Sequence, residues 1–162
     1  MPSFYAIDCE MVQNNMNQGM LARVSLVDED LRIVMDEYVK PTHPVSDYRT
    51  WISGIQPGYE RDAKPKNEVI NRLRNIIHGH VLVGCDIQKD LDVLGISHPN
   101  VRDVATYGPF LKNGQKQSLK TLAYQELGIN IQNGSHDSIE DARAVMKIYK
   151  KHRFQMSYKI RI

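Results

Sequence analysis

The 162-residue chain has the length of one domain and is large enough to build a hydrophobic core. Its 41% hydrophobic and 25% charged residues are ordinary for a globular protein and exclude the disordered and fibrous classes. The net charge of +2 is too small to indicate a polyanionic partner by itself. We expect a single domain over residues 1–162, with a core of residues 4–153 and a C-terminal tail of residues 154–162.

The sequence lacks a membrane span, a secretory signal and a metal-binding spacing of cysteines. No apolar run approaches the length of a membrane span, and the first residues lack the pattern of a secretory signal, so we expect an intracellular protein without membrane association. Cys9 and Cys85 share no metal-binding or CxxC spacing. Reduced thiols are therefore expected, and a zinc site or disulfide framework is not.

The order of predicted elements favours an α/β fold. A central strand is predicted over residues 4–12, because apolar residues lie on both of its faces, and two antiparallel neighbours follow over residues 20–27 and 33–39. A long loop rich in Pro and Gly then precedes a helix that begins at Pro65. The remaining predicted elements are a strand at 81–85, a helix capped by Asp86 and ended by Gly95, a strand at 101–105, and helices at 118–127 and 137–153. Such an order predicts a mixed sheet flanked by helices.

The start of the last predicted helix carries an unusual pair of side chains. Asp137 and Glu140 have the spacing of a capping box, which places His136 just before the helix and Asp141 in its second turn. These two positions usually hold apolar residues that contact each other, but here they hold an imidazole and a carboxylate. The pair indicates either a functional site or two ordinary solvated residues.

Carboxylates also interrupt the apolar face of the first strand. Asp8 and Glu10 are two residues apart, so they project from the same face, about 7 Å apart along the strand. They need a compensating charge there, and Arg23 or Arg49 is a structural candidate. Asp90 lies one turn into the helix after the fourth strand, where the helix dipole alone would favour an anion.

The topology can bring Asp8, Glu10, Asp90 and Asp141 to one end of the sheet. Like charges about 4 Å apart repel by roughly 4 kcal/mol at an effective dielectric constant near 20, so several such pairs require bound cations. Carboxylate oxygens select Mg²⁺ or Mn²⁺ over zinc or copper, and two such ions suit hydrolysis of a phosphodiester. His136 is then placed to act as the general base for the attacking water.

Three ordered motifs resemble those of the DEDDh 3′→5′ exonucleases of the ribonuclease H-like superfamily. They are Ala6-Ile7-Asp8-Cys9-Glu10-Met11-Val12, Val83-Gly84-Cys85-Asp86-Ile87-Gln88-Lys89-Asp90-Leu91 and His136-Asp137-Ser138-Ile139-Glu140-Asp141-Ala142. Shorter segments resemble the RNA exonuclease 4 and interferon-stimulated exonuclease branch, including Leu21-Ala22-Arg23-Val24-Ser25, Asp47-Tyr48-Arg49-Thr50 and Ser118-Leu119-Lys120-Thr121-Leu122. The resemblance extends from Phe4 to about Lys151.

The resemblance implies a five-stranded mixed sheet in the order 3-2-1-4-5, with the second strand antiparallel. It further implies that Asp8, Glu10, Asp90 and Asp141 bind two divalent cations, and that His136 is the general base. Such enzymes release nucleoside monophosphates from the 3′ end of a single-stranded nucleic acid. RNA is the expected substrate, DNA is left open, and a monomer in the nucleus or nucleolus is expected, with the cytoplasm as an alternative.

Substrate contacts are also expected from the resemblance. Met11, Arg23 and Arg49 are the candidates, Met11 for the terminal nucleotide and the arginines for phosphates. The period of the strand alone favours a core position for Met11. Tyr48, Trp51 and Tyr59 can stack on bases or pack in the fold.

Two other functions are compatible with the same sequence. One is an endonuclease of the same superfamily. This function is disfavoured by the presence of His136 and by the Asp-Cys-Glu-Met motif. The other is a catalytically silent module that binds nucleic acid, which the intact set of five reactive residues disfavours. Departures from the branch, such as Cys85 where a histidine is usual, remove no expected metal ligand.

Overall fold

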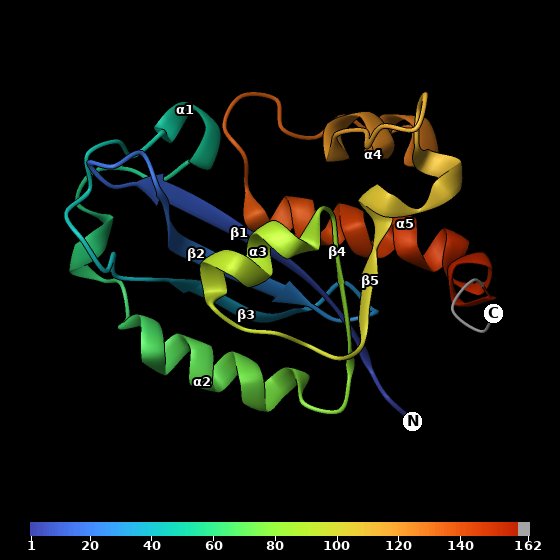
Figure 1. Cartoon of the computed structure of the whole chain (residues 1–162), viewed down its shortest axis with the longest axis horizontal. Helices are drawn as coiled ribbons and strands as arrows, with labels where there is room; N and C mark the ends of the chain where they lie inside the picture. Colours follow the sequence, from blue (N-terminus) through green and yellow to red (C-terminus); the bar gives the residue numbers. More distant parts are fainter. Residues whose placement is uncertain (159–162) are drawn as a thin grey trace.

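A five-stranded sheet forms the centre of the molecule (Figure 1). The structure is a computed structural model that describes residues 1–158. The strands are β1 (Phe4–Gln13), β2 (Gly19–Val27), β3 (Ile33–Tyr38), β4 (Val81–Gly84) and β5 (Val101–Asp103), in the spatial order β3-β2-β1-β4-β5. β2 is antiparallel to β1 and β3, whereas β4 is parallel to β1 and β5. The predicted strand order and direction are confirmed.

Helices cover both faces of the sheet. The α-helices are α1 (Thr50–Ser53), α2 (Lys66–Ile77), α3 (Ile87–Leu94), α4 (Leu119–Leu127) and α5 (Ser138–Tyr158), with short 3₁₀ helices at Tyr59–Arg61, Val104–Thr106 and Gly108–Phe110. One hydrophobic cluster joins the sheet to α4 and α5, and a second joins the other face to α2 and α3. None of the helices in residues 1–158 is both long enough and apolar enough to span a membrane.

The predicted boundaries differ from the structure in three places. The last helix continues to Tyr158, so residues 154–158 of the predicted tail are helical, and residues 159–162 lie outside the described residues. The predicted strand at 101–105 ends at Asp103 and continues as a 3₁₀ helix. The long loop after β3 contains the short helix α1, which was not predicted because four residues are too few to show a helical period.

An opening in the sheet determines where polar residues gather. β4 pairs with β1 only as far as Ala6, and β1 continues to Gln13 without β4 beside it. The chain leaves β4 through a tight turn in which a Cβ on Gly84 would lie 2.8 Å from the Ile87 side chain, so glycine is required there. The carboxyl ends of two parallel strands thus diverge at one edge, where open α/β sheets commonly place their sites.

Candidate active site

Four carboxylates meet at this opening. β1 directs Asp8 and Glu10 to the same face as Ala6, whose side chain belongs to the cluster packed under α4 and α5. α3 contributes Asp90, and α5 contributes Asp141. Glu10, Asp90 and Asp141 expose only 5%, 5% and 2% of their surface.

A cavity of about 330 Å³ opens onto this cluster. Asp8, Glu10, His136 and Asp141 line it, whereas Asp90 is buried and is not among its lining residues. Possible ligand atoms of Glu10, His136 and Asp141 all lie within 4.8 Å of one another. The predicted meeting of His136 with Asp141 is therefore confirmed.

Burial and mutual repulsion alter the acidity of the cluster. Burial is the first cause for each group, and it raises the pKa of Glu10 to about 8 and the pKa values of Asp90 and Asp141 to about 7. The pKa of Asp8 also rises, because burial and then the charges of Asp90, Asp141 and Glu10 all disfavour its ionised form. Without cations, the folded chain therefore keeps protons on carboxyl groups at neutral pH.

The donor set fits hard divalent cations. Asp141 Oδ1 is buried and has no hydrogen-bond partner among the described residues, which is costly unless another group binds it. Carboxylate oxygens are the ligands that Mg²⁺ and Mn²⁺ prefer. Binding of cations would remove both the repulsion between the carboxylates and the unpaired oxygen.

A stability measurement tests this electrostatic arrangement. In the presence of chelator, the free energy of unfolding is expected to fall as the pH rises from about 5 to about 8. Folded Glu10, Asp90 and Asp141 release their protons only near pH 8, 7 and 7, whereas the same groups in the unfolded chain release them near 4.5, 3.8 and 3.8. The folded state therefore binds more protons over this range, and rising pH favours unfolding.

Addition of Mg²⁺ should reverse this loss, most strongly at the higher pH, since the cation replaces the protons. Urea unfolding at the two pH values, with chelator and with Mg²⁺, measures both effects. Greater stability at the higher pH in chelator would contradict the arrangement.

The backbone around His136 is held beside the carboxylates from two directions. The His136 N–H donates to the Ile52 carbonyl over 2.6 Å, which ties it to α1. On its other side, Asp137 immediately precedes α5 and caps its start. The Asp137 carbonyl accepts from the Asp141 N–H, and Asp137 Oδ1 accepts from the Ile139 N–H at 3.0 Å. Burial, followed by the positive charge of Lys120, lowers the pKa of His136. The ring is therefore neutral at neutral pH and able to accept a proton.

Residues 5–149 match the family model RNase_T, which describes an exonuclease. The chain belongs to this exonuclease family. Among curated relatives, RNA exonuclease 4 of Gibberella zeae is 44% identical over 156 residues, which cover 93% of this chain and 49% of the relative. RNA exonuclease 4 of Saccharomyces cerevisiae is 41% identical over 155 residues, which cover 91% and 54%. The chain spans about half the length of these relatives.

Solved structures of exonuclease domains show the same fold. The Pan2 catalytic unit of Neurospora crassa superposes with a TM-score of 0.84 and 27% identity, over 98% of this chain and 29% of that one. The Saccharomyces cerevisiae Pan2 module in complex with A7 RNA gives a TM-score of 0.85 and 32% identity, over 99% and 30%. Members of this exonuclease family generally use divalent metals, in agreement with the acidic cluster at the opening of the sheet.

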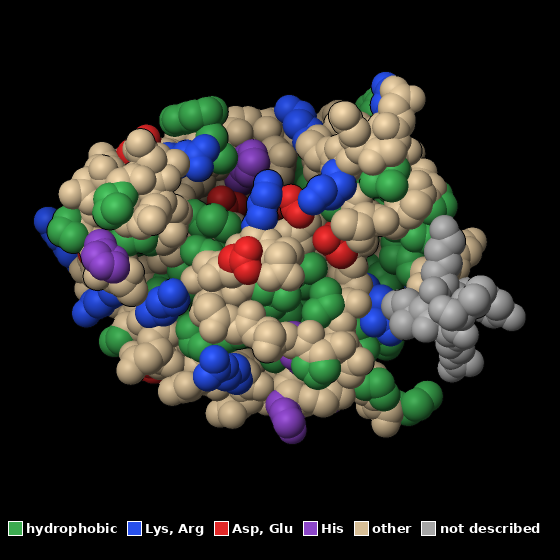
Figure 2. Space-filling model, viewed as in Figure 1, with side chains coloured by type: hydrophobic (Ala, Val, Ile, Leu, Met, Phe, Trp, Pro, Cys, Tyr) green, Lys and Arg blue, Asp and Glu red, His purple; other side chains and the backbone are tan. Residues whose placement is uncertain are grey.

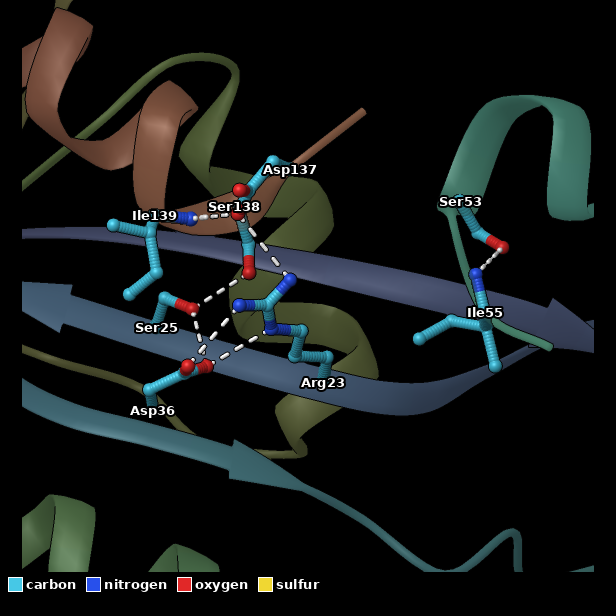
Figure 3. Close-up of polar contacts among 8 residues, drawn as sticks. All are labelled: Arg23, Ser25, Asp36, Ser53, Ile55, Asp137, Ser138 and Ile139. Carbon is cyan, nitrogen blue, oxygen red and sulfur yellow. Dashed lines mark hydrogen bonds and ion pairs between the residues drawn. The ribbon is translucent and has the colours of Figure 1, made fainter. Parts of the chain in front are cut away.

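A polar network fixes the beginning of α5 in this exonuclease domain (Figure 3). The hydroxyls of Ser25 on β2 and Ser138 on α5 are 2.6 Å apart and buried, and Ser25 also donates to Asp36 on β3 over 3.0 Å. Arg23 binds both oxygens of Asp36 at 2.9 and 3.1 Å and reaches Asp137 at 3.2 Å. The network thus holds the helix start that carries His136 and Asp141.

The contacts of Arg23 bear on its two predicted roles, a structural charge partner and a phosphate contact. Its guanidinium is already occupied by two carboxylates and lies 5.2 Å from the centre of the Tyr38 ring. Its positive charge also lowers the pKa of Glu10, against the effect of burial. This environment favours the alternative of a structural charge partner over the predicted phosphate contact.

The other predicted substrate contacts lie near the exonuclease site but not in its cavity wall. Met11 follows a β-bulge after Glu10, is partly buried and packs against the cluster under α2 and α3. Arg49 adopts a left-handed backbone conformation at the start of α1 and is partly buried. Trp51 on α1 is 74% exposed, whereas the rings of Tyr48 and Tyr59 pack edge to face.

Two capping predictions were wrong. Asp86 does not cap α3 with its side chain; instead Asp103, at the end of β5, accepts from the N–H groups of Asp86 and Ile87 at 2.8 and 3.3 Å. Glu140 likewise does not complete the capping box, because its Oε1 accepts from the Gln132 N–H at 3.0 Å. At α3 a residue distant in sequence thus supplies the cap, and at α5 the Glu140 carboxylate binds the preceding loop.

Gly54, to which the sequence assigned no role in the site, controls the fit between α1 and His136. Its φ is +72°, and a Cβ there would lie 2.9 Å from the His136 carbonyl oxygen. We expect Gly54→Ala to lower stability by about 1 to 2 kcal/mol through backbone strain and to lower the nuclease kcat on the order of tenfold through displacement of His136. Steady-state kinetics and urea unfolding measure the two effects separately.

Gly58→Ala is the matched control, because Gly58 has a φ of +92° but no atom within 4 Å of the position that a Cβ would take. It should lose a similar amount of stability and keep its kcat. Equal losses of kcat in both variants would show that the contact with His136 is unimportant.

Proposed function

We propose that this domain is a 3′→5′ exonuclease that hydrolyses single-stranded RNA to nucleoside 5′-monophosphates. The observation that carries the proposal is the convergence of four carboxylates from three elements beside His136, with one buried oxygen of Asp141 unpaired among the described residues. RNA is favoured because relatives with 44% and 41% identity are RNA exonucleases by name. The yeast Pan2 module, which is similar in fold, has been solved with RNA.

In the proposed mechanism, Asp8, Glu10, Asp90 and Asp141 would hold two divalent cations, Mg²⁺ or Mn²⁺. When bound, these ions supply charge stabilisation for in-line displacement at the scissile phosphate. His136 accepts the proton of the attacking water through its neutral ring, since its pKa is lowered. The Ile52 carbonyl and the cap at Asp137 hold the backbone that carries the ring, and His136 lines the cavity.

The proposed unit is one exonuclease domain that includes residues 1–162. Both hydrophobic clusters are built from elements between Phe4 and Met156, which supports one core unit over that range. A nuclear or nucleolar location stays a prediction.

One assay tests the function. The purified chain is incubated with 5′-labelled single-stranded RNA and with DNA of the same sequence, in Mg²⁺, in Mn²⁺ and in chelator, beside Asp8→Asn. A stepwise ladder shortened from the 3′ end, absent in chelator and in Asp8→Asn, is the expected result. Binding without a ladder under both metals would instead identify a silent binding module, and cleavage of a circular RNA would identify an endonuclease.

A further inference from the structure

Two lysines form part of the wall of the carboxylate cavity. Lys89 extends from α3, and Lys116 extends from the segment between the last 3₁₀ helix and α4. Both contact the same carboxylate, because Lys116 Nζ lies 2.9 Å from Asp86 Oδ1 and Lys89 Nζ lies 3.1 Å from Asp86 Oδ2. Figure 2 shows basic and acidic side chains and a histidine gathered around one hollow of the surface.

This part of the wall carries an excess of positive charge. Two ammonium groups share one carboxylate, so the group of three has a net charge of +1, in contrast to the acids at the base of the cavity. Lys120, in the first turn of α4, adds a further positive charge that is close enough to act on His136. Two segments therefore bring cations to the cavity wall, and a third brings one close enough to act on His136.

The ion pairs at Asp86 contribute little to the fold itself. The side chains of Lys89 and Lys116 are 77% and 52% exposed, and solvent-exposed ion pairs stabilise proteins only slightly. The single carboxylate of Asp86 nevertheless positions the two ammonium groups, and its one negative charge cannot neutralise both. A lysine ammonium kept at the mouth of a cavity in this way is suited to contact a phosphate as a point charge.

We propose that Lys89 and Lys116 bind backbone phosphates of the substrate strand where it leaves the cavity. This inference rests on the proposed function, because a strand with its scissile phosphate at Asp8 and Asp141 must carry its next phosphates out through the cavity mouth. The two lysines and Asp86 line that cavity, and the lysine side chains are largely exposed. Contacts of this kind fix the position of a strand and carry no base preference.

The test is the salt dependence of RNA binding. Affinity for a short 5′-fluorescent single-stranded RNA is measured at several KCl concentrations and constant Mg²⁺, in an Asp8→Asn background that prevents cleavage. Removal of one phosphate-binding charge should reduce the slope of log K against log salt by about 0.7. Lys89→Gln and Lys116→Gln are each expected to do so. Between about 50 and about 200 mM salt, each variant should therefore lose about 2.5-fold less affinity than the parent.

Two variants serve as controls. Lys116→Arg retains the charge and should retain the slope. Lys112→Gln removes a charge from the same segment, at an exposed residue that is absent from the cavity wall, and should also retain the slope. Unchanged slopes in Lys89→Gln and Lys116→Gln, or an equal decrease in Lys112→Gln, would overturn the proposal.

The binding assay separates this proposal from the proposed function. If the chain with Asp8 intact gives no ladder but the two glutamine variants lower the slope, the phosphate contacts hold and the exonuclease activity does not. If a ladder appears and the slopes are unchanged, only the phosphate contacts are refuted. If the parent binds no RNA, the phosphate contacts are refuted, and the ladder assay with Asp8 intact decides the exonuclease activity.

Discussion

Asp141→Asn is expected to reduce nuclease kcat on the order of 10³-fold while making the metal-free chain more stable. The loss follows from removal of a predicted cation ligand. The gain follows because the buried carboxylate of Asp141, whose pKa is raised to about 7, repels Glu10 and Asp8, and an amide ends that repulsion. In chelator near pH 8, we expect a rise of about 1 to 2 kcal/mol in the free energy of unfolding.

Asp92→Asn is the control, because Asp92 is an exposed acid on α3 that contacts Gln88 outside the cluster. It should leave kcat and stability nearly unchanged. Urea unfolding in chelator and steady-state kinetics in Mg²⁺ give both readouts. Destabilisation of the metal-free Asp141→Asn chain would show that the carboxylate is favourably paired and would refute the repulsive cluster.

His136→Gln is expected to reduce kcat by about 10²- to 10⁴-fold, the range that removal of a general base produces. The stabilisation of the fold by Mg²⁺ should persist in this variant, because the four carboxylates are intact. The activity of the wild type should decrease as the pH falls through the lowered pKa of His136, and the residual activity of the variant should lack that decrease. Kinetics over a range of pH and thermal unfolding with and without Mg²⁺ measure these effects.

A different outcome would assign His136 another role. A ring nitrogen of His136 lies within 4.8 Å of carboxylate oxygens of Glu10 and Asp141, so the three residues could bind one cation directly. In that case His136→Gln would also lose the Mg²⁺-dependent stabilisation. His43→Gln, at an exposed position in the loop after β3, is the matched control and should change neither quantity.

Local patterns in the sequence were sufficient to predict a mixed sheet flanked by helices, whereas the strand order was implied by the family resemblance. Apolar residues on both faces of residues 4–12 correctly placed β1 at the centre, and the stripe of Ile87, Leu91 and Leu94 is buried as expected. The spacing of Asp8 and Glu10 correctly placed them on one face, and the helix start at Asp137 correctly brought His136 toward Asp141. These features depend on side chains within two turns of helix or a few residues of strand.

The features that were missed depend on contacts between distant segments. Asp103 caps α3 from 17 residues away on another strand, so the cap was assigned to the nearer Asp86. Ile52 holds His136 across 84 residues, and no pattern in either segment announces the contact. The ion pair between Arg23 and Asp36 joins two strands, and no local pattern predicted it. The sequence therefore left Arg23 as a candidate for a substrate contact.

The dispersal of the four carboxylates along the chain has a consequence for biosynthesis. Asp8 belongs to an early strand, but Asp141 belongs to α5, whose buried face packs on β1 and β2. Pairing between segments so far apart closes late and slowly during folding. A nascent chain surrounded by ribosomal RNA therefore exposes no complete carboxylate site until α5 has been synthesised and has docked.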